Sequence, residues 1–162
     1  MVRRAIPLAI EQRVRTMARN RCGYCLSPQH LVMARLEIEH IIPLAQGGTD
    51  GEPNLWLACP LCNGHKSDKV AAIDPESGSL FPLFNPRRQV WSEHFAWTDD
   101  GVQIVGKTSI GRATVMALHL SDHLDAVLVK YYHSARRIAS QTSAHAECCA
   151  EHSTETACHS LP

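Results

Sequence analysis

The sequence predicts a mixed α+β fold that is small and depends in part on a bound metal ion. Three observations lead to this class. Two Cys-x-x-Cys pairs frame a segment of 33 residues, an arrangement typical of a metal site. Residues 36–42 alternate between polar and apolar, as a half-buried strand does. Apolar residues recur at helical spacing over 8–20 and 111–138. Helices and short strands around a metal are therefore expected.

The elements can be placed in chain order. Residues 8–20 form an amphipathic helix, and Pro43 should end the strand at 36–42. The loop 45–51 is rich in turn-forming residues, and Asp99-Asp100-Gly101 should centre a hairpin. The remaining expected elements are a short strand at 54–57, a helix from the second cysteine pair to about residue 70, a turn at 74–78, a hairpin over 95–105 and a long helix over 111–138.

The two cysteine pairs are the strongest signal in the chain. Cys22-x-x-Cys25 and Cys59-x-x-Cys62 can each grip one side of a tetrahedral Zn²⁺ ion. Four unrelated buried thiols or a redox pair are the alternatives. The apolar run near the N-terminus is too short for an export signal, which favours a cytoplasmic, reducing location where disulfides are rare. A closed four-cysteine site leaves no open position for water, so this zinc is expected to be structural.

Charge distribution points to nucleic acid although the net charge is zero. The first 25 residues contain six arginines and a single acid, Glu11. A local basic cluster attracts phosphates even in a neutral chain. No apolar run approaches the roughly 18 residues that a membrane helix needs, so no membrane partner is expected.

Between and after the cysteine pairs stand a carboxylate, a histidine and amides. Phosphodiester hydrolysis needs a base to activate water and a cation to stabilise developing negative charge. Histidine suits the base because its ordinary pKa lies near neutrality. Carboxylate and amide oxygens are hard ligands that suit Mg²⁺. In each case a structural role as a buried histidine, surface acid, turn residue or helix cap is the alternative.

One extended motif runs through this region: Cys-x-x-Cys, then Glu39-His40-Ile-Ile-Pro-Leu-x-x-Gly-Gly, then Asn54-Leu, then Cys-x-x-Cys-Asn63-x-x-Lys. This motif resembles that of the HNH endonuclease family. The motif match spans residues 22–66, and a looser likeness to small stand-alone bacterial and cyanobacterial HNH proteins extends through 85–95 and 110–114. The resemblance implies a ββα-metal (His-Me finger) fold stapled by the zinc site.

The resemblance also implies a role for each motif residue. His40 matches the general base, and Glu39 matches the acid that binds a catalytic Mg²⁺ or Mn²⁺ ion. Asn54 matches the central asparagine that holds the loop of the base through backbone hydrogen bonds. Asn63 stands where the final histidine of the motif is found, which makes this an H-N-N variant. Adjacent strand residues point to opposite faces, so Glu39 and His40 can serve one site only if the strand departs from regular geometry.

The resulting organisation has four parts. Residues 1–21 are a basic N-terminal helix, 22–70 the HNH nuclease domain, 71–139 a hairpin and helix extension, and 140–162 a tail of low complexity that is expected to be disordered. The predicted function is metal-dependent hydrolysis of DNA, most simply double-stranded DNA. The expected phosphate contacts are Arg13, Arg15, Arg19, Lys66 and Lys69.

Two other readings remain open. A zinc-ribbon module that binds nucleic acid without cutting it would need the cysteines but not Glu39, His40 and Asn63. A structural or interaction protein would use the helix at 111–138 as a dimer element. Six histidines and cysteines of the tail could form a second metal site, although their spacing fits no familiar one: His145, Cys148, Cys149, His152, Cys158 and His159.

Overall fold

A computed structural model describes residues 6–121. The expected mixed α+β class is confirmed, with three separate two-stranded antiparallel sheets and four α-helices in the described part. The tail at 140–162 and the whole segment 122–139, which includes the C-terminal part of the helix predicted over 111–138, lie outside the described residues. The helices are α1 (Leu8–Met17), α2 (Pro60–Lys66), α3 (Trp91–His94) and α4 (Ser109–Leu118), and the strands are β1 (Glu37–His40), β2 (Leu55–Ala58), β3 (Ala71–Ile73), β4 (Leu80–Pro82), β5 (Phe95–Trp97) and β6 (Ile104–Gly106).

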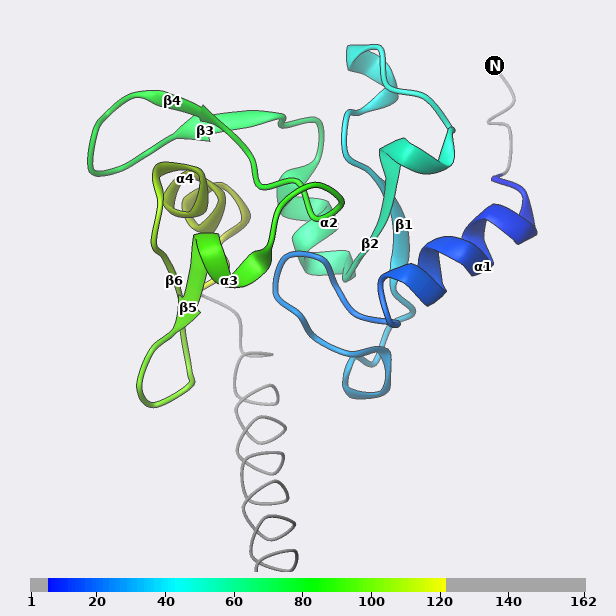
Figure 1. The fold of residues 1–162 in the computed structure, drawn as a ribbon, viewed down its shortest axis with the longest axis horizontal. Helices are drawn as coiled ribbons and strands as arrows, with labels where there is room; N and C mark the ends of the chain where they lie inside the picture. Colours follow the sequence, from blue (N-terminus) through cyan, green and yellow to red (C-terminus); the bar gives the residue numbers. More distant parts are fainter. Residues whose placement is uncertain (1–5, 122–162) are drawn as a thin grey trace, which may run out of the picture.

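Short 3-10 turns connect the first half of the chain. They cover Gln29–Leu31, Leu44–Gln46 and Glu52–Asn54. The last of these leads directly into β2, which pairs with β1 so that His40 lies opposite Leu55. Leu55 and Leu57 are fully buried on β2. In Figure 1, α1, β1 and β2 lie on one side of the molecule and α2 lies centrally, beside the segments that follow it.

Residues 71–121 form the second side, which we call the C-terminal extension. It comprises the hairpins β3–β4 and β5–β6, with α3 between them and α4 packed against β3, β4 and β6 (Figure 1). The hairpin predicted over 95–105 is confirmed as β5–β6, and Gly101 in its turn has φ +68°. The β3–β4 hairpin has strands of only three residues, too short to give a clear alternating pattern.

Three helix ends differ from the sequence prediction. The N-terminal helix stops at Met17 because Arg19 and Asn20 adopt positive φ, which turns the chain into the first cysteine pair. The helix after the second pair stops at Lys66, where Ser67 has φ +49°. The continuous helix predicted from 111 to 138 is wrong, since α4 ends at Leu118 and His119 forms a left-handed cap at φ +53°. Apolar periodicity does not reveal such single-residue breaks.

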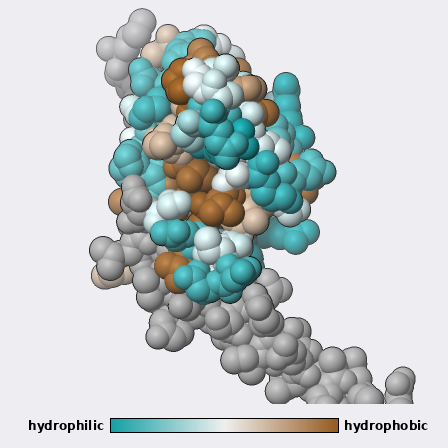
Figure 2. Space-filling model, turned by 90° about the vertical axis from the view of Figure 1, so that its left-hand side faces the viewer, coloured by the Kyte–Doolittle hydropathy of each residue, from teal (hydrophilic) through white to brown (hydrophobic). Residues whose placement is uncertain are grey.

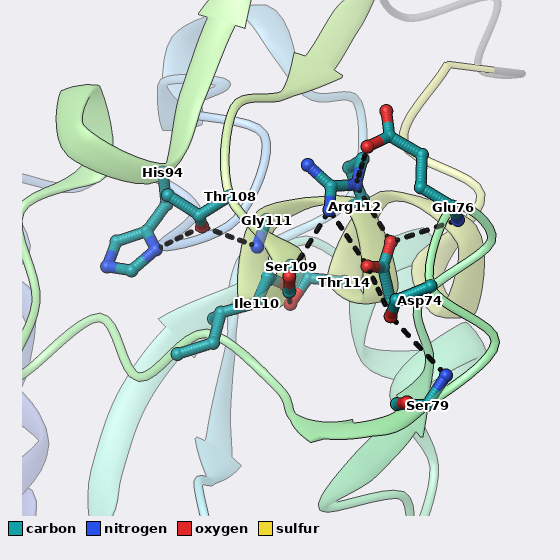
Figure 3. A network of polar contacts seen from close by, with 11 residues as sticks. Asp74, Glu76, Ser79, His94, Thr108, Ser109, Ile110, Gly111, Arg112 and Thr114 are labelled. Carbon is teal, nitrogen blue, oxygen red and sulfur yellow. Dashed lines mark hydrogen bonds and ion pairs between the residues drawn. The ribbon is translucent and has the colours of Figure 1, made fainter.

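A network of polar contacts joins the helices and hairpins of the extension to one another (Figure 3). The Arg112 guanidinium on α4 donates two hydrogen bonds of 2.8 Å to the carboxylate of Asp74, which is fully buried after β3. Thr108 caps α4 by accepting from the Gly111 amide at 3.1 Å, and His94 contacts the same hydroxyl at 2.7 Å. The β3–β4 hairpin, α3 and α4 are thereby held in fixed relation.

Apolar side chains gather on the outer side of the extension (Figure 2). A pocket of about 380 Å³ in the extension is lined mainly by Ile104, Val105, Val115 and Met116. It contains none of the predicted site residues. Among the described residues, no helix has the length and apolar character needed to cross a bilayer.

Candidate metal centre and active site

The four motif cysteines converge in the interior. Cys22, Cys25, Cys59 and Cys62 are all buried and form no disulfide, and their sulfur atoms all lie within 4.8 Å of one another. The Cys25 and Cys59 sulfurs are 3.8 Å apart. Tetrahedral zinc with Zn–S bonds of about 2.3 Å requires sulfurs about 3.8 Å apart. Four buried cysteines in this geometry suggest a structural zinc site, as the sequence predicts.

Local structure prepares these sulfurs to hold a cation. Cys59 is the N-cap of α2, and its sulfur accepts a hydrogen bond from the Cys62 amide at 3.4 Å. Hydrogen bonding with Cys22 lowers the pKa of both Cys25 and Cys59, whereas burial raises the pKa of Cys22. The thiolate form that zinc requires is therefore easier to reach at Cys25 and Cys59 than at Cys22.

His40 is the last residue of β1 and stands at the start of a tightly held loop. Its Nε2 lies 2.9 Å from Oδ1 of Asp50. Asn54 holds the same loop, because its side chain accepts from the Ile42 amide and donates to the carbonyls of Ile42 and Thr49, each at 2.9 Å. A Cβ at Gly48 would lie 1.8 Å from the Ile42 carbonyl oxygen, so only glycine permits this close passage.

Glu39 lies in a different environment from the one expected of a surface acid. Its side chain is 2% exposed, and Oε1 contacts the Lys66 ammonium at 2.6 Å and accepts from the Tyr24 hydroxyl at 3.2 Å. Oε2 is buried and has no partner. Since β1 pairs regularly with β2 up to His40, the side chains of Glu39 and His40 leave opposite faces of the strand.

Asn63 on α2 contacts a carboxylate other than Glu39. Its Nδ2 donates to Oε2 of Glu37 at 2.6 Å. A carboxylate can only accept here, so the Asn63 amide oxygen stays available to another group. The structure thus brings Asn63 to Glu37, while the only cluster of three or more metal-binding side chains among the described residues is that of the four cysteines.

Most of the predicted phosphate contacts have partners within the protein. Arg13 pairs with Glu52 at 2.7 Å, and Lys69 donates to the His65 carbonyl. Arg15 is half-buried and bonds both Glu11 and the Leu36 carbonyl. Arg19, by contrast, is exposed and its guanidinium makes no hydrogen bond or ion pair with a described residue.

The expectation that Lys66 contacts phosphate is corrected by the structure. Its side chain is 2% exposed, and its ammonium bonds Glu39 and the His40 carbonyl. The ammonium therefore makes its contacts inside the protein and does not reach solvent. Sequence position alone, three residues after Asn63 on a short helix, cannot show that the residue points inward.

Asp50 is a site residue that sequence reasoning missed. It lies in the turn-rich loop between His40 and Asn54, where an acid is ordinary. The signal that could have found it is its place inside a loop whose two ends both carry motif residues. Its contact with His40 gives the imidazole a fixed orientation.

Comparison with known families supports this region as a unit. Residues 22–69 match the model of the HNH family, described as HNH endonuclease. Searches against curated proteins and against solved structures gave no match. The matched span contains the cysteine cluster, β1, the His40 loop, β2 and α2. Residues 22–69 of this chain are an HNH endonuclease domain built around a buried cluster of four cysteines.

Proposed function

We propose that this protein is a metal-dependent endonuclease that hydrolyses phosphodiester bonds in DNA. The observation that carries the proposal is the HNH match over residues 22–69, with His40 at the end of β1 in a loop fixed by Asn54 and Asp50. The succession β1, β2 and α2 around this loop supports a ββα-metal fold, with zinc as its structural ion. The flanking segments 1–21 and 71–139 then act as supports of a nuclease domain at 22–70.

His40 is the proposed general base. Its Nε2 is engaged by Asp50, so Nδ1 is the nitrogen left to take a proton from the attacking water. Asn54 fixes the backbone on which this ring stands through three hydrogen bonds. A base held in this way needs little reorganisation when the substrate arrives.

A catalytic divalent cation, Mg²⁺ or Mn²⁺, would be held by Glu39 and Asn63, and this needs the Glu39 side chain to turn from its buried face of β1 toward the face of His40. Oε2 of Glu39 is buried without a partner, and Oδ1 of Asn63 stays available while its amide nitrogen donates to Glu37. Both are hard oxygen donors of the kind such ions prefer. When bound, the ion supplies charge stabilisation for the transition state and the leaving oxygen. Lys66 neutralises one oxygen of Glu39 and ties it to the His40 backbone.

Duplex DNA is the proposed partner, with phosphate contacts at the basic N-terminal helix. Arg19 is best placed for such a contact because it is exposed and its guanidinium makes no hydrogen bond or ion pair with a described residue. Arg13 and Lys69 can join by exchanging weak exposed contacts for phosphate. Arg15 instead ties α1 to the Leu36 backbone.

Nicking of supercoiled plasmid tests the function directly. With Mg²⁺ or Mn²⁺ added, the protein should convert supercoiled DNA to the open circle. His40→Ala should slow cleavage by roughly two to four orders of magnitude without changing the metal requirement. The matched control is His30→Ala, which removes a histidine that belongs to no motif. If the wild type and the His30→Ala control bind labelled duplex but do not cleave it, the protein is instead a zinc-ribbon binding module.

A further inference from the structure

A pocket of about 340 Å³ adjoins the His40 loop, and no role has been given to it. One wall is formed by Ile41 and Ile42, which follow His40 directly, and by Lys66, which donates to the His40 carbonyl. The wall from the C-terminal extension is formed by Pro82, Leu83, Phe84, Asn85, Arg88 and Gln89. The pocket therefore lies at the seam between the HNH domain and the extension, against the two residues that follow the proposed base.

The wall from the extension is firmly held. The Leu83 amide donates to the Val70 carbonyl at 2.9 Å, and the Phe84 amide donates to Thr114 Oγ1 at 2.8 Å. Arg87 donates to the Leu55 carbonyl at 2.8 Å and lies over the Trp56 ring. The wall is therefore formed before any ligand arrives, as in most small-molecule sites.

A compact turn at 85–89 presents polar groups to this pocket. The Asn85 side-chain oxygen accepts from the Arg87 amide at 3.0 Å, and the Gln89 side-chain oxygen accepts from the Asn85 amide at 2.7 Å. Both side-chain oxygens are thus used inside the turn. Neither NH₂ group makes a hydrogen bond to another described residue, and both residues line the pocket, so they can donate to a ligand.

Arg88 supplies charge at the same place. It is exposed, lines the pocket, and its guanidinium makes no hydrogen bond or ion pair with any described residue. Its neighbour Arg87 differs, since its guanidinium is half-buried and bonded to β2. The chain therefore uses one arginine to anchor the turn and leaves the next one available.

Apolar walls, two amide donors and a free guanidinium suit a flat ring with polar edges that is joined to an anion. We propose that this pocket holds the nucleotide next to the scissile phosphate, with its base between the isoleucine and proline–phenylalanine walls and its phosphate on Arg88. The inference rests on the proposed nuclease function, because it treats the occupant as part of the DNA strand cut beside His40. It assigns substrate positioning to the extension.

Nuclear magnetic resonance titration of the full zinc-loaded chain with deoxyadenosine 5′-monophosphate tests the pocket without any cleavage. Signals from Ile41, Ile42 and the side-chain amides of Asn85 and Gln89 should shift. Arg88→Ala should weaken this binding about tenfold, as expected for one charge-assisted contact. Arg35→Ala, which removes the same charge from an exposed site outside the pocket, is the matched control. Shifts confined to other regions, or equal affinity in Arg88→Ala, would overturn the proposal.

A variant that fills the pocket tests whether the pocket takes part in DNA cleavage. Val70→Trp should fill the pocket mouth, abolish nucleotide binding and lower plasmid nicking at least about tenfold, whereas Val90→Trp should change neither. Loss of nucleotide binding with nicking unchanged overturns the subsite and leaves the nuclease intact. If the wild type binds nucleotide at the pocket yet never nicks DNA with Mg²⁺ or Mn²⁺, the nuclease proposal fails and the substrate assignment fails with it. Deoxyadenosine should bind Arg88→Ala and wild type equally, because it has no phosphate.

Discussion

Glu39 in the HNH domain and Asp74 in the C-terminal extension are both buried acids paired with a cation from a helix, but their oxygens are used differently. Asp74 has both oxygens satisfied: Oδ1 accepts from Arg112 and the Glu76 amide (Figure 3). Oδ2 accepts from Arg112 and Ser77. Glu39 has only Oε1 engaged, by Lys66 and Tyr24, while Oε2 has no partner.

This difference is consistent with a structural role for the Asp74 pair and with the cation-binding role proposed for Glu39. A buried oxygen without a partner costs stability unless a ligand satisfies it. The Asp74 pair has no such deficit and serves to join β3 to α4. The Glu39 pair keeps one acceptor in reserve, which supports its proposed role as a ligand of the catalytic cation.

The largest expected effect concerns the cysteine cluster of the HNH domain. Cys59→Ser removes one of the four proposed zinc ligands and also the sulfur that accepts from the Cys62 amide. The melting temperature should fall by roughly 10 °C or more, since bound zinc contributes directly to folding. Cys158→Ser, which removes a thiol outside the cluster, should change little. Metal analysis should give one zinc per chain; an unchanged melting temperature in Cys59→Ser would count against structural zinc.

Paired substitutions test the comparison itself. Glu39→Gln should destabilise the fold by about 3–5 kcal/mol, because it leaves the Lys66 ammonium buried without its partner. The double variant Glu39→Gln/Lys66→Met should recover most of that stability in urea unfolding. It should still cleave at least about tenfold more slowly at limiting Mn²⁺, since the proposed metal ligand is lost.

The matched pair in the extension is Asp74→Asn/Arg112→Met. It should leave the cleavage rate per folded molecule unchanged. Equal loss of cleavage in the two double variants would show that Glu39 acts only through stability, which would remove the distinction drawn between the two acids.

Some of these features can be predicted from the sequence alone, and others cannot. The cysteine cluster, β1, β2 and the β5–β6 hairpin are predictable because paired cysteine spacing, alternation and turn residues are local signals. The inward orientation of Lys66 and the pairing of Asn63 with Glu37 are not, because both depend on how α2 packs against β1. The contact of Asp50 with His40 closes a loop of ten residues, and no local pattern encodes it.

The dependence of stability on acid pH should reveal the ion pair between Asp74 and Arg112. The two hydrogen bonds from Arg112 hold the pKa of Asp74 well below its ordinary value near 3.9. A depressed pKa in the folded state contributes stability that is fully present above the unfolded pKa and is lost as pH falls through the folded one. The urea midpoint of wild type should therefore exceed that of Asp74→Asn at pH 7, and the gap should narrow below about pH 4. A gap that stays constant down to pH 2 would contradict the ion-pair assignment.

The smallest expected effect is at the basic helix. Arg19→Gln should weaken duplex binding a few-fold for all sequences and lower the salt slope by about one. Arg15→Gln should instead lower thermal stability, since it breaks the contacts with Glu11 and the Leu36 carbonyl. Fluorescence anisotropy at several salt concentrations measures the first and thermal unfolding the second. Identical salt slopes in Arg19→Gln and wild type would mark Arg19 as a solvated surface charge.

The Arg87 contact described above, with a second one from Trp91, also sets an order of maturation during synthesis. Trp91 Nε1 donates to the Tyr24 carbonyl at 2.7 Å, and Arg87 donates to the Leu55 carbonyl at 2.8 Å. All four cysteines precede both donors in the chain, so a nascent polypeptide has the complete cysteine cluster before these two donors are made. Metal capture can thus come first on the ribosome, and closure of the nuclease domain waits for a segment translated some twenty-five residues after Cys62.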